Sequence, residues 1–187
     1  MTQPTATCFP DADRDALWAG INDGTVSTVC TDHAPWTLED KLVPTLTASN
    51  LRHGMAELET MLPVLWSEGV ATGQISVARF VEVTSTTSAR LFGTYPRKGT
   101  IAPGSDADIV VWNPHDVRTV DGSTMHSNAG YSPYDGWEIT GWSELTISRG
   151  EIVARATAAG IDVTGEPGRG QPAARTRSDQ LLRPQGT

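Results

Sequence analysis

The chain has 187 residues, of which 18 are glycine and 12 are proline, and its formal net charge is −8 at pH 7. This length is sufficient for one domain, or two small ones, with a hydrophobic core. The negative charge argues against nucleic acid and against anionic membranes as partners.

The location of the protein is predicted from what the sequence lacks. Its two cysteines, Cys8 and Cys30, are too few for a disulfide framework. No charged and apolar leader is found at the N-terminus, and no apolar run approaches the ~20 residues of a membrane span. We therefore expect a cytoplasmic protein with no membrane segment.

A helix followed by a strand is predicted at the start of the chain. Asp11 or Asp13 could cap a helix that ends at Gly24. Residues 25–31 are rich in β-branched side chains, which predicts a strand. Helix, short turn and strand in this order are typical of an α/β unit.

Residues 34–53 are predicted to form a long loop, of a length that is more often functional than filler. Three helices are expected after it. The first runs from Met55 through Trp66 to Gly69 with a kink or weak point at Pro63, the second is capped by Ser76 and runs to Val81, and the third spans Thr84 to Phe92.

The chain becomes rich in β-structure after residue 95. A strand is predicted from Ala107 to Trp112, ended by Asn113-Pro114, and Arg149-Gly150 predicts a hairpin turn. From residue 164 onwards glycine, proline, arginine and glutamine dominate, which predicts a flexible tail. The predicted parts are therefore residues 1–95, 96–163 and 164–187.

Asp32 and His33 follow the predicted strand at its carboxyl end, which is where (β/α) barrels place catalytic groups. The Asp32 carboxylate suits a divalent metal and can act as a general base, but it could equally cap the next turn. For His33 the simpler interpretation is a ring bonded to a backbone carbonyl, and for His53 it is a loop turn.

The four histidines of the chain are not expected to form a zinc site by themselves. They include no HxH pair and no HExxH motif, and His115 and His126 are expected on the surface of the β-rich part. A catalytic zinc usually needs three protein ligands. The sequence therefore does not predict a self-contained zinc site.

Several segments, in one order along the chain, resemble the C-terminal part of cyclic amidohydrolases, most closely dihydropyrimidinases and hydantoinases. They are Val29–Pro35, His53–Glu59, Leu62–Gly69, Phe80–Ser85, Tyr95–Val110, Tyr134–Gly141, Ser148–Val153 and Gly165–Gly168. The stretch from Lys98 to Asp108 is similar to the wider superfamily, whereas the predicted helix at 55–69 and the Tyr134–Gly141 stretch point towards hydantoinases.

The resemblance implies an α/β fold with a partial TIM barrel over residues 1–95 and part of a small β-sandwich over residues 96–163. In such enzymes two divalent metals, usually zinc, activate a hydroxide that attacks the ring carbonyl of a cyclic amide or imide. Asp32 corresponds to an aspartate that ligates one metal and passes the hydroxide proton to the leaving ring nitrogen. His53, where the family usually has asparagine, and Gly54 correspond to a segment whose backbone binds the substrate ring.

The other metal ligands of the family have no match in this chain. They are an HxH pair, a carboxylated lysine and two further histidines, all from earlier barrel strands. We therefore expect the isolated chain to have little or no activity. The expected partners are a small cyclic amide substrate and either a complementing N-terminal chain or further copies in a homo-oligomer. The alternatives are a non-catalytic dihydropyrimidinase-related interaction protein and a gene fragment, and retention of Asp32 favours the hydrolase.

Overall fold

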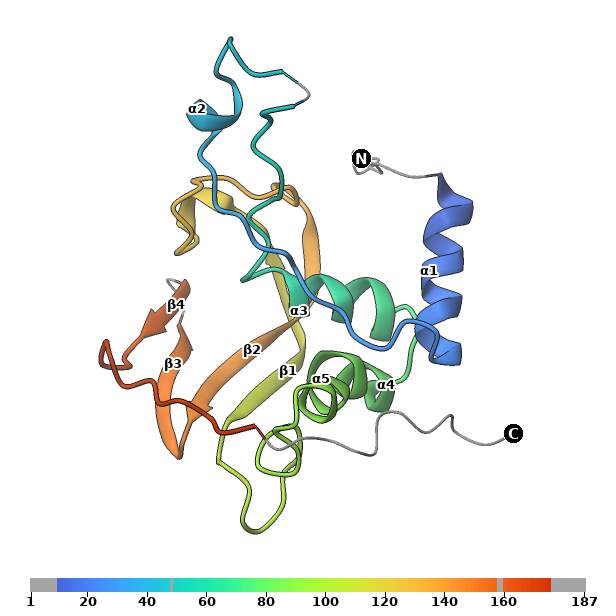
Figure 1. Cartoon of the computed structure of the whole chain (residues 1–187), viewed down its shortest axis with the longest axis vertical. Helices are drawn as coiled ribbons and strands as arrows, with labels where there is room; N and C mark the ends of the chain where they lie inside the picture. The colour runs from blue at the N-terminus through green and yellow to red at the C-terminus, as the bar shows by residue number, and fades with distance from the viewer. Residues whose placement is uncertain (1–9, 48, 158–159, 176–187) are drawn as a thin grey trace.

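The computed structural model describes residues 10–47, 49–157 and 160–175. Cys8 and the last twelve residues of the predicted tail lie outside these ranges, and Cys30 is a free, exposed thiol. In Figure 1 the helices α3 (Met61–Leu65), α4 (Val77–Val81) and α5 (Thr87–Leu91) lie beside one end of a sheet. Helix α1 (Asp11–Asp23) lies on the side of these helices that faces away from the sheet. No helix in the described ranges has the length and apolar character needed to span a membrane.

Helix α1 (Asp11–Asp23) confirms the first predicted helix, and it ends at Gly24, whose φ is 91°. The predicted capping was wrong, because Pro10 is the N-cap and makes no side-chain cap bond. Asp11 and Asp13 instead lie in the first turn, where negative side chains interact favourably with the helix dipole.

The predicted strand over residues 25–31 was wrong. This segment is extended but pairs with no strand among the described residues. Its backbone is held by single hydrogen bonds, from Val26 N–H to the Gly20 carbonyl at 2.8 Å and from Val29 N–H to the Val83 carbonyl at 3.1 Å. β-branched residues favour a strand, but a hydrogen-bonded ladder also needs a neighbouring strand, and the described sheet lies elsewhere.

The predicted long loop contains a short helix, α2 (Leu38–Lys41). A capping box between Thr37 and Asp40 caps the N-terminus of this helix. The next helix begins at Met61 rather than Met55, as α3 (Met61–Leu65), and continues through the π-helical segment η1 (Trp66–Val70). Pro63 therefore lies in the first turn, where its missing N–H costs nothing and no kink is required.

The two helices predicted after Ser76 form one continuous helical run. Its parts are α4 (Val77–Val81), the π-helical segment η2 (Glu82–Thr86) and α5 (Thr87–Leu91). The predicted cap is confirmed, because the Ser76 hydroxyl accepts a hydrogen bond from Arg79 N–H at 3.1 Å. The predicted restart at Thr84 was wrong, since this residue lies inside η2.

In the part of the chain that the structure describes, four antiparallel strands form the sheet in the order β1-β2-β3-β4. They are β1 (Ile109–Thr119), β2 (Glu138–Ser148), β3 (Glu151–Thr157) and β4 (Gly160–Val163), with the 3-10 helix η3 (Gly122–Thr124) between the first two. The β2–β3 turn at Arg149-Gly150 is confirmed, and both residues have positive φ, 49° and 82°.

Asn113-Pro114 does not end the first strand, contrary to the prediction. Asn113 pairs with Trp142 and Val117 pairs with Thr140, so the longer stretch of β1 forms a bulge. A bulge releases residues from the ladder, and it therefore accommodates a proline that has no N–H to donate.

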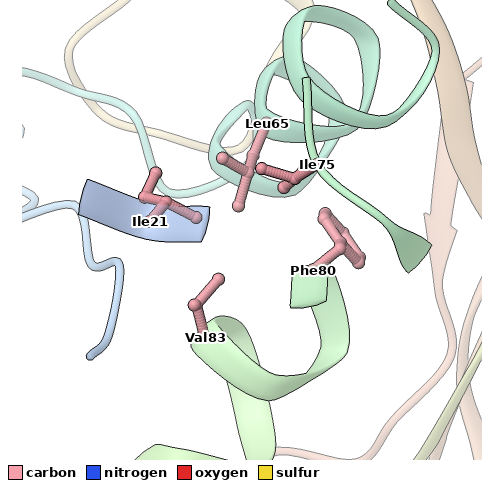
Figure 2. Close-up of a cluster of buried hydrophobic side chains, with 5 residues drawn as sticks. All are labelled: Ile21, Leu65, Ile75, Phe80 and Val83. Carbon is pink, nitrogen blue, oxygen red and sulfur yellow. The ribbon is translucent and has the colours of Figure 1, made fainter. Parts of the chain in front are cut away.

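Among the described residues, two hydrophobic clusters hold these layers together. The first, shown in Figure 2, joins α1 and α3 to the helical run through Ile21, Leu65, Ile75, Phe80 and Val83. Full burial of one such side chain contributes about 1.5–3 kcal/mol. The second cluster lies on the sheet and contains Val120, Ile139 and Trp142.

Trp66 connects the helices to the sheet. Its ring centroid lies 5.3 Å from that of Phe80 on α4 and 5.5 Å from that of Trp112 on β1. Beside it, the Ser67 hydroxyl accepts a hydrogen bond from the Thr140 N–H of β2 at 3.2 Å. The helical layer therefore docks on β1 and β2 through both apolar and polar contacts.

Candidate active site

Asp32 lies where the extended segment 25–31 meets the loop that carries α2. Its side chain is exposed, and its backbone is left-handed with φ 49°. This conformation is uncommon for a residue other than glycine, and it persists only where surrounding contacts impose it. The structure therefore gives Asp32 a constrained backbone as well as an accessible carboxylate.

The contacts that follow Asp32 come from residues 54–58. Ala34 N–H donates to the Met55 carbonyl at 3.0 Å, and the His33 ring atom Nδ1 accepts hydrogen bonds from the N–H groups of Glu57 and Leu58, each at 3.1 Å. A ring nitrogen that accepts a hydrogen bond carries no proton, so the proton of the neutral ring lies on Nε2.

His33 is thus bonded to backbone, as the sequence indicated, but to amides rather than to a carbonyl. Its two partners lie 24 and 25 residues further along the chain. No local sequence pattern could have identified them, because the pairing depends on how the loop returns.

Gly54 lies against the Asp32 loop. A Cβ added at Gly54 would lie 2.5 Å from the Ala34 Cβ and 3.4 Å from the Asp32 carbonyl oxygen, and its φ is +89°. Both the space and the backbone conformation therefore require glycine here. The structure brings Gly54 beside Asp32, while the His53 side chain is exposed.

The two arms of the intervening loop are joined near their base. The Arg52 guanidinium carbon lies 4.7 Å from the centre of the Trp36 ring, and Lys41 Nζ donates a hydrogen bond to the Gly54 carbonyl. These contacts fix the start and the end of the loop relative to each other.

The donor atoms near Asp32 do not make a complete metal site. Within the described ranges, no group of three or more histidine, cysteine, aspartate and glutamate side chains could hold a metal ion. Asp32 can supply one carboxylate, which is fewer ligands than a divalent transition metal usually takes from a protein. The described part of the chain therefore does not fit a metal by itself.

A second polar group lies next to this segment and involves residues of the connection between β1 and β2. Burial raises the pKa of the Glu57 carboxyl above its ordinary value. Burial, and then the Glu57 charge, raise the pKa of the Tyr134 hydroxyl. Glu59 accepts from the His126 N–H at 2.9 Å and lies 2.9 Å from its Nδ1.

A hollow of about 770 Å³ lies on the sheet, apart from the Asp32 loop. Glu59, His126, Trp112 and Trp142 are among its lining residues, and neither Asp32 nor the other predicted site residues line it. As predicted, His115 is exposed and His126 is largely so. The geometry gives no reason to assign this hollow to the Asp32 site.

Comparison with known proteins identifies the family. The model of the amidohydrolase family matches residues 5–153. The chain is 40% identical over 161 residues to the D-phenylhydantoinase of Escherichia coli O1:K1, a match that covers 85% of this chain and 34% of the relative. The chain thus spans about a third of the length of the curated relatives it matches.

Solved structures agree with this match. A D-hydantoinase (dihydropyrimidinase) from Thermus sp. superposes with a TM-score of 0.80 at 36% identity, covering 87% of this chain and 34% of that chain. The dihydropyrimidinase from Brevibacillus agri NCHU1002 gives 0.76 at 38% identity, covering 81% and 33%. Proteins of this family generally use divalent metals. The predicted resemblance to cyclic amidohydrolases is confirmed, and the chain belongs to the amidohydrolase family.

Proposed function

We propose that the chain forms part of a hydrolase that opens cyclic amides or imides of the dihydropyrimidine or hydantoin type. The observation that supports this most directly is the family match over residues 5–153, which includes both Asp32 and Gly54. The matched relative is a D-phenylhydantoinase, a name that does not favour the non-catalytic alternative. A cytoplasmic location remains part of the proposal.

Asp32 is the proposed catalytic residue. In ring opening, water adds to the ring carbonyl carbon, the C–N bond breaks, and the ring nitrogen gains a proton. An accessible carboxylate can accept the proton of the attacking oxygen and pass it to that nitrogen. Asp32 would also supply one oxygen ligand to a divalent metal, which we propose to be zinc in a binuclear centre.

The backbone of His53 and Gly54 is the proposed binding segment for the substrate ring. Gly54 lies beside Asp32, so a ring held there would be within reach of the carboxylate. Lys41 bonds the Gly54 carbonyl and thereby holds this segment in place. The exposed His53 side chain is not given a role.

The remaining metal ligands are proposed to come from a second polypeptide. The described residues do not make a metal site, and the match covers only 34% of the relative's length. A complementing chain with the missing histidines would satisfy both observations. A homo-oligomer is the alternative partner, although further copies of this chain would add no ligand types that one copy lacks.

The test is a ring-opening assay with hydantoin and dihydrouracil in the presence of zinc. We expect the purified chain to show no turnover above buffer, and co-expression with the remainder of a D-hydantoinase to produce turnover. Asp32→Asn should then lower kcat by about 100-fold or more, whereas Asp13→Asn, on the exposed first turn of α1, should not. Turnover by the chain alone, or complemented activity that survives Asp32→Asn, would contradict the proposal.

A further inference from the structure

The strained backbone of Asp32 has contacts on its C-terminal side that could impose it. His33 N–H donates to the Thr31 hydroxyl at 3.1 Å, and the His33 ring accepts two amides from Glu57 and Leu58. Together these bonds fix the residue after Asp32 at both its backbone and its side chain. A residue between fixed neighbours cannot return to an extended conformation without breaking them.

The amides that His33 binds also need a partner. The Glu57 carbonyl accepts hydrogen bonds from Thr60 N–H at 3.1 Å and Met61 N–H at 2.9 Å, so residues 57–61 form the turn that opens α3. The first amides of a helical turn have no partner within it and are normally capped by a nearby side chain. Here the partner of both amides is the ring of His33, a residue distant in sequence, whereas Thr60, the N-cap of α3 itself, makes no side-chain cap bond.

We propose that His33 is a positioning residue that acts through Asp32. Its ring joins the Asp32 loop to the turn that precedes α3, and this connection holds Asp32 in its left-handed backbone conformation beside Gly54. The importance of this position rests on the proposed function, in which the Asp32 carboxylate takes part in ring opening. The hydrogen bonds from the Glu57 and Leu58 amides to the His33 ring, called the joint below, are observed independently of that function.

The chemistry of the joint makes a specific demand on the side chain. Position 33 must present one acceptor atom to two converging N–H groups, so an imidazole with its proton on Nε2 satisfies it. The amide oxygen of asparagine is also an acceptor with two lone pairs, on a shorter side chain. Phenylalanine keeps the planar ring but offers no acceptor.

The test is nuclear magnetic resonance on the full chain labelled with ¹⁵N. The ring nitrogens of His33 in the wild type should show an unprotonated Nδ1 and a protonated Nε2. Scalar couplings of Asp32 should report its positive φ, and the Glu57 and Leu58 amides should exchange slowly with solvent. A protonated Nδ1 in the neutral ring would overturn the proposal without the need for any variant.

Variants separate positioning from general stabilisation. His33→Phe should shift the Asp32 couplings towards an extended backbone and speed exchange at Glu57 and Leu58 by about tenfold or more, while His33→Asn should restore both. His115→Phe, at an exposed position on β1, is the control and should change neither. If His33→Phe leaves these signals unchanged, or if His33→Asn folds but fails to restore them, the proposal is wrong.

These measurements also separate the proposal from the proposed function. If Asp32→Asn has no effect on complemented turnover, the catalytic role fails while the spectroscopic result for His33 stands. If the His33 signals disagree while Asp32→Asn abolishes turnover, the joint fails and the catalytic role stands. Should His33→Phe not fold, the wild-type ring nitrogens and His33→Asn still decide.

Discussion

The Trp66 indole occupies the space that any side chain on Gly141 would need. A Cβ on Gly141 would lie 2.1 Å from Trp66 Cδ1, and Gly141 has φ +93°. The helical layer meets β2 at this position, beside the hydrogen bond from Thr140 N–H to the Ser67 hydroxyl. Close approach of helix and sheet therefore depends on one residue without a side chain.

Gly141→Ala should destabilise the chain by roughly 2–4 kcal/mol, because it adds a steric clash to a strained φ. Gly136→Ala is the matched control, since Gly136 also has a positive φ, +81°, but has open space around its Cβ position. It should cost only about 1 kcal/mol. Urea unfolding of both variants measures the difference, and equal losses would show that the Trp66 contact is unimportant.

Local chemistry made several elements predictable from the sequence. Gly24 ends α1, Ser76 caps α4, and Arg149-Gly150 forms the β2–β3 turn, as expected. Each depends on neighbours within a few residues, so the sequence contains the whole signal. The prediction that Asn113-Pro114 ends the strand was wrong because the outcome depends on a distant partner. Pairing with β2 continues β1 past the proline, which lies in a bulge.

The site was predictable only in part. Asp32 could be singled out from its position after an apolar run, and Gly54 from the family motif. The strand predicted before Asp32 does not form because no described strand lies beside it to pair with. The β-branched residues of the segment do not reveal whether such a partner exists. The hydrogen bonds of His33 could not be predicted, because its partners, Glu57 and Leu58, become neighbours only after the loop has closed.

Asp108 joins the loop before β1 to the β2–β3 turn. Its carboxylate is bonded to Lys98 Nζ and accepts from Arg149 N–H at 2.8 Å. The bond to Lys98 is the main reason why the pKa of Asp108 lies below its ordinary value of 3.8. A carboxyl whose pKa is lowered by folding stabilises the folded state at pH values above its ordinary pKa. That stability is lost as the pH falls through the folded-state pKa.

Asp108→Asn should therefore lower stability near neutral pH by roughly 0.5–1 kcal/mol, a value reduced by the partial exposure of the pair. The difference from wild type should shrink once pH falls below the ordinary range of aspartate, near 3.8. Unfolding curves across this range test it, with Asp162→Asn, at an exposed position on β4, as the control. A difference that is independent of pH would show that the charge of Asp108 contributes nothing.

Glu57 should have the opposite pH dependence, because burial raises its pKa above the ordinary 4.5. Between 4.5 and the raised value the folded state binds more protons than the unfolded state, so stability falls as pH rises. Glu57→Gln should remove this loss and be more stable than wild type near neutral pH, with the difference vanishing below 4.5. Glu144→Gln, at an exposed position on β2, should show no such trend. A wild-type advantage at neutral pH would contradict this assignment.

Zinc should not stabilise the chain in the absence of a partner. Asp32 offers one carboxylate, and the described residues contain no group of three or more metal-binding side chains. A ligand raises the unfolding temperature only as far as it binds the folded state in preference to the unfolded one. Zinc in about tenfold excess should therefore shift the midpoint of thermal unfolding by no more than about 1 °C. Replacing both cysteines with serine controls for binding through thiols. A zinc-dependent rise that survives this replacement and disappears in Asp32→Asn would show that the chain builds a metal site without a complementing polypeptide.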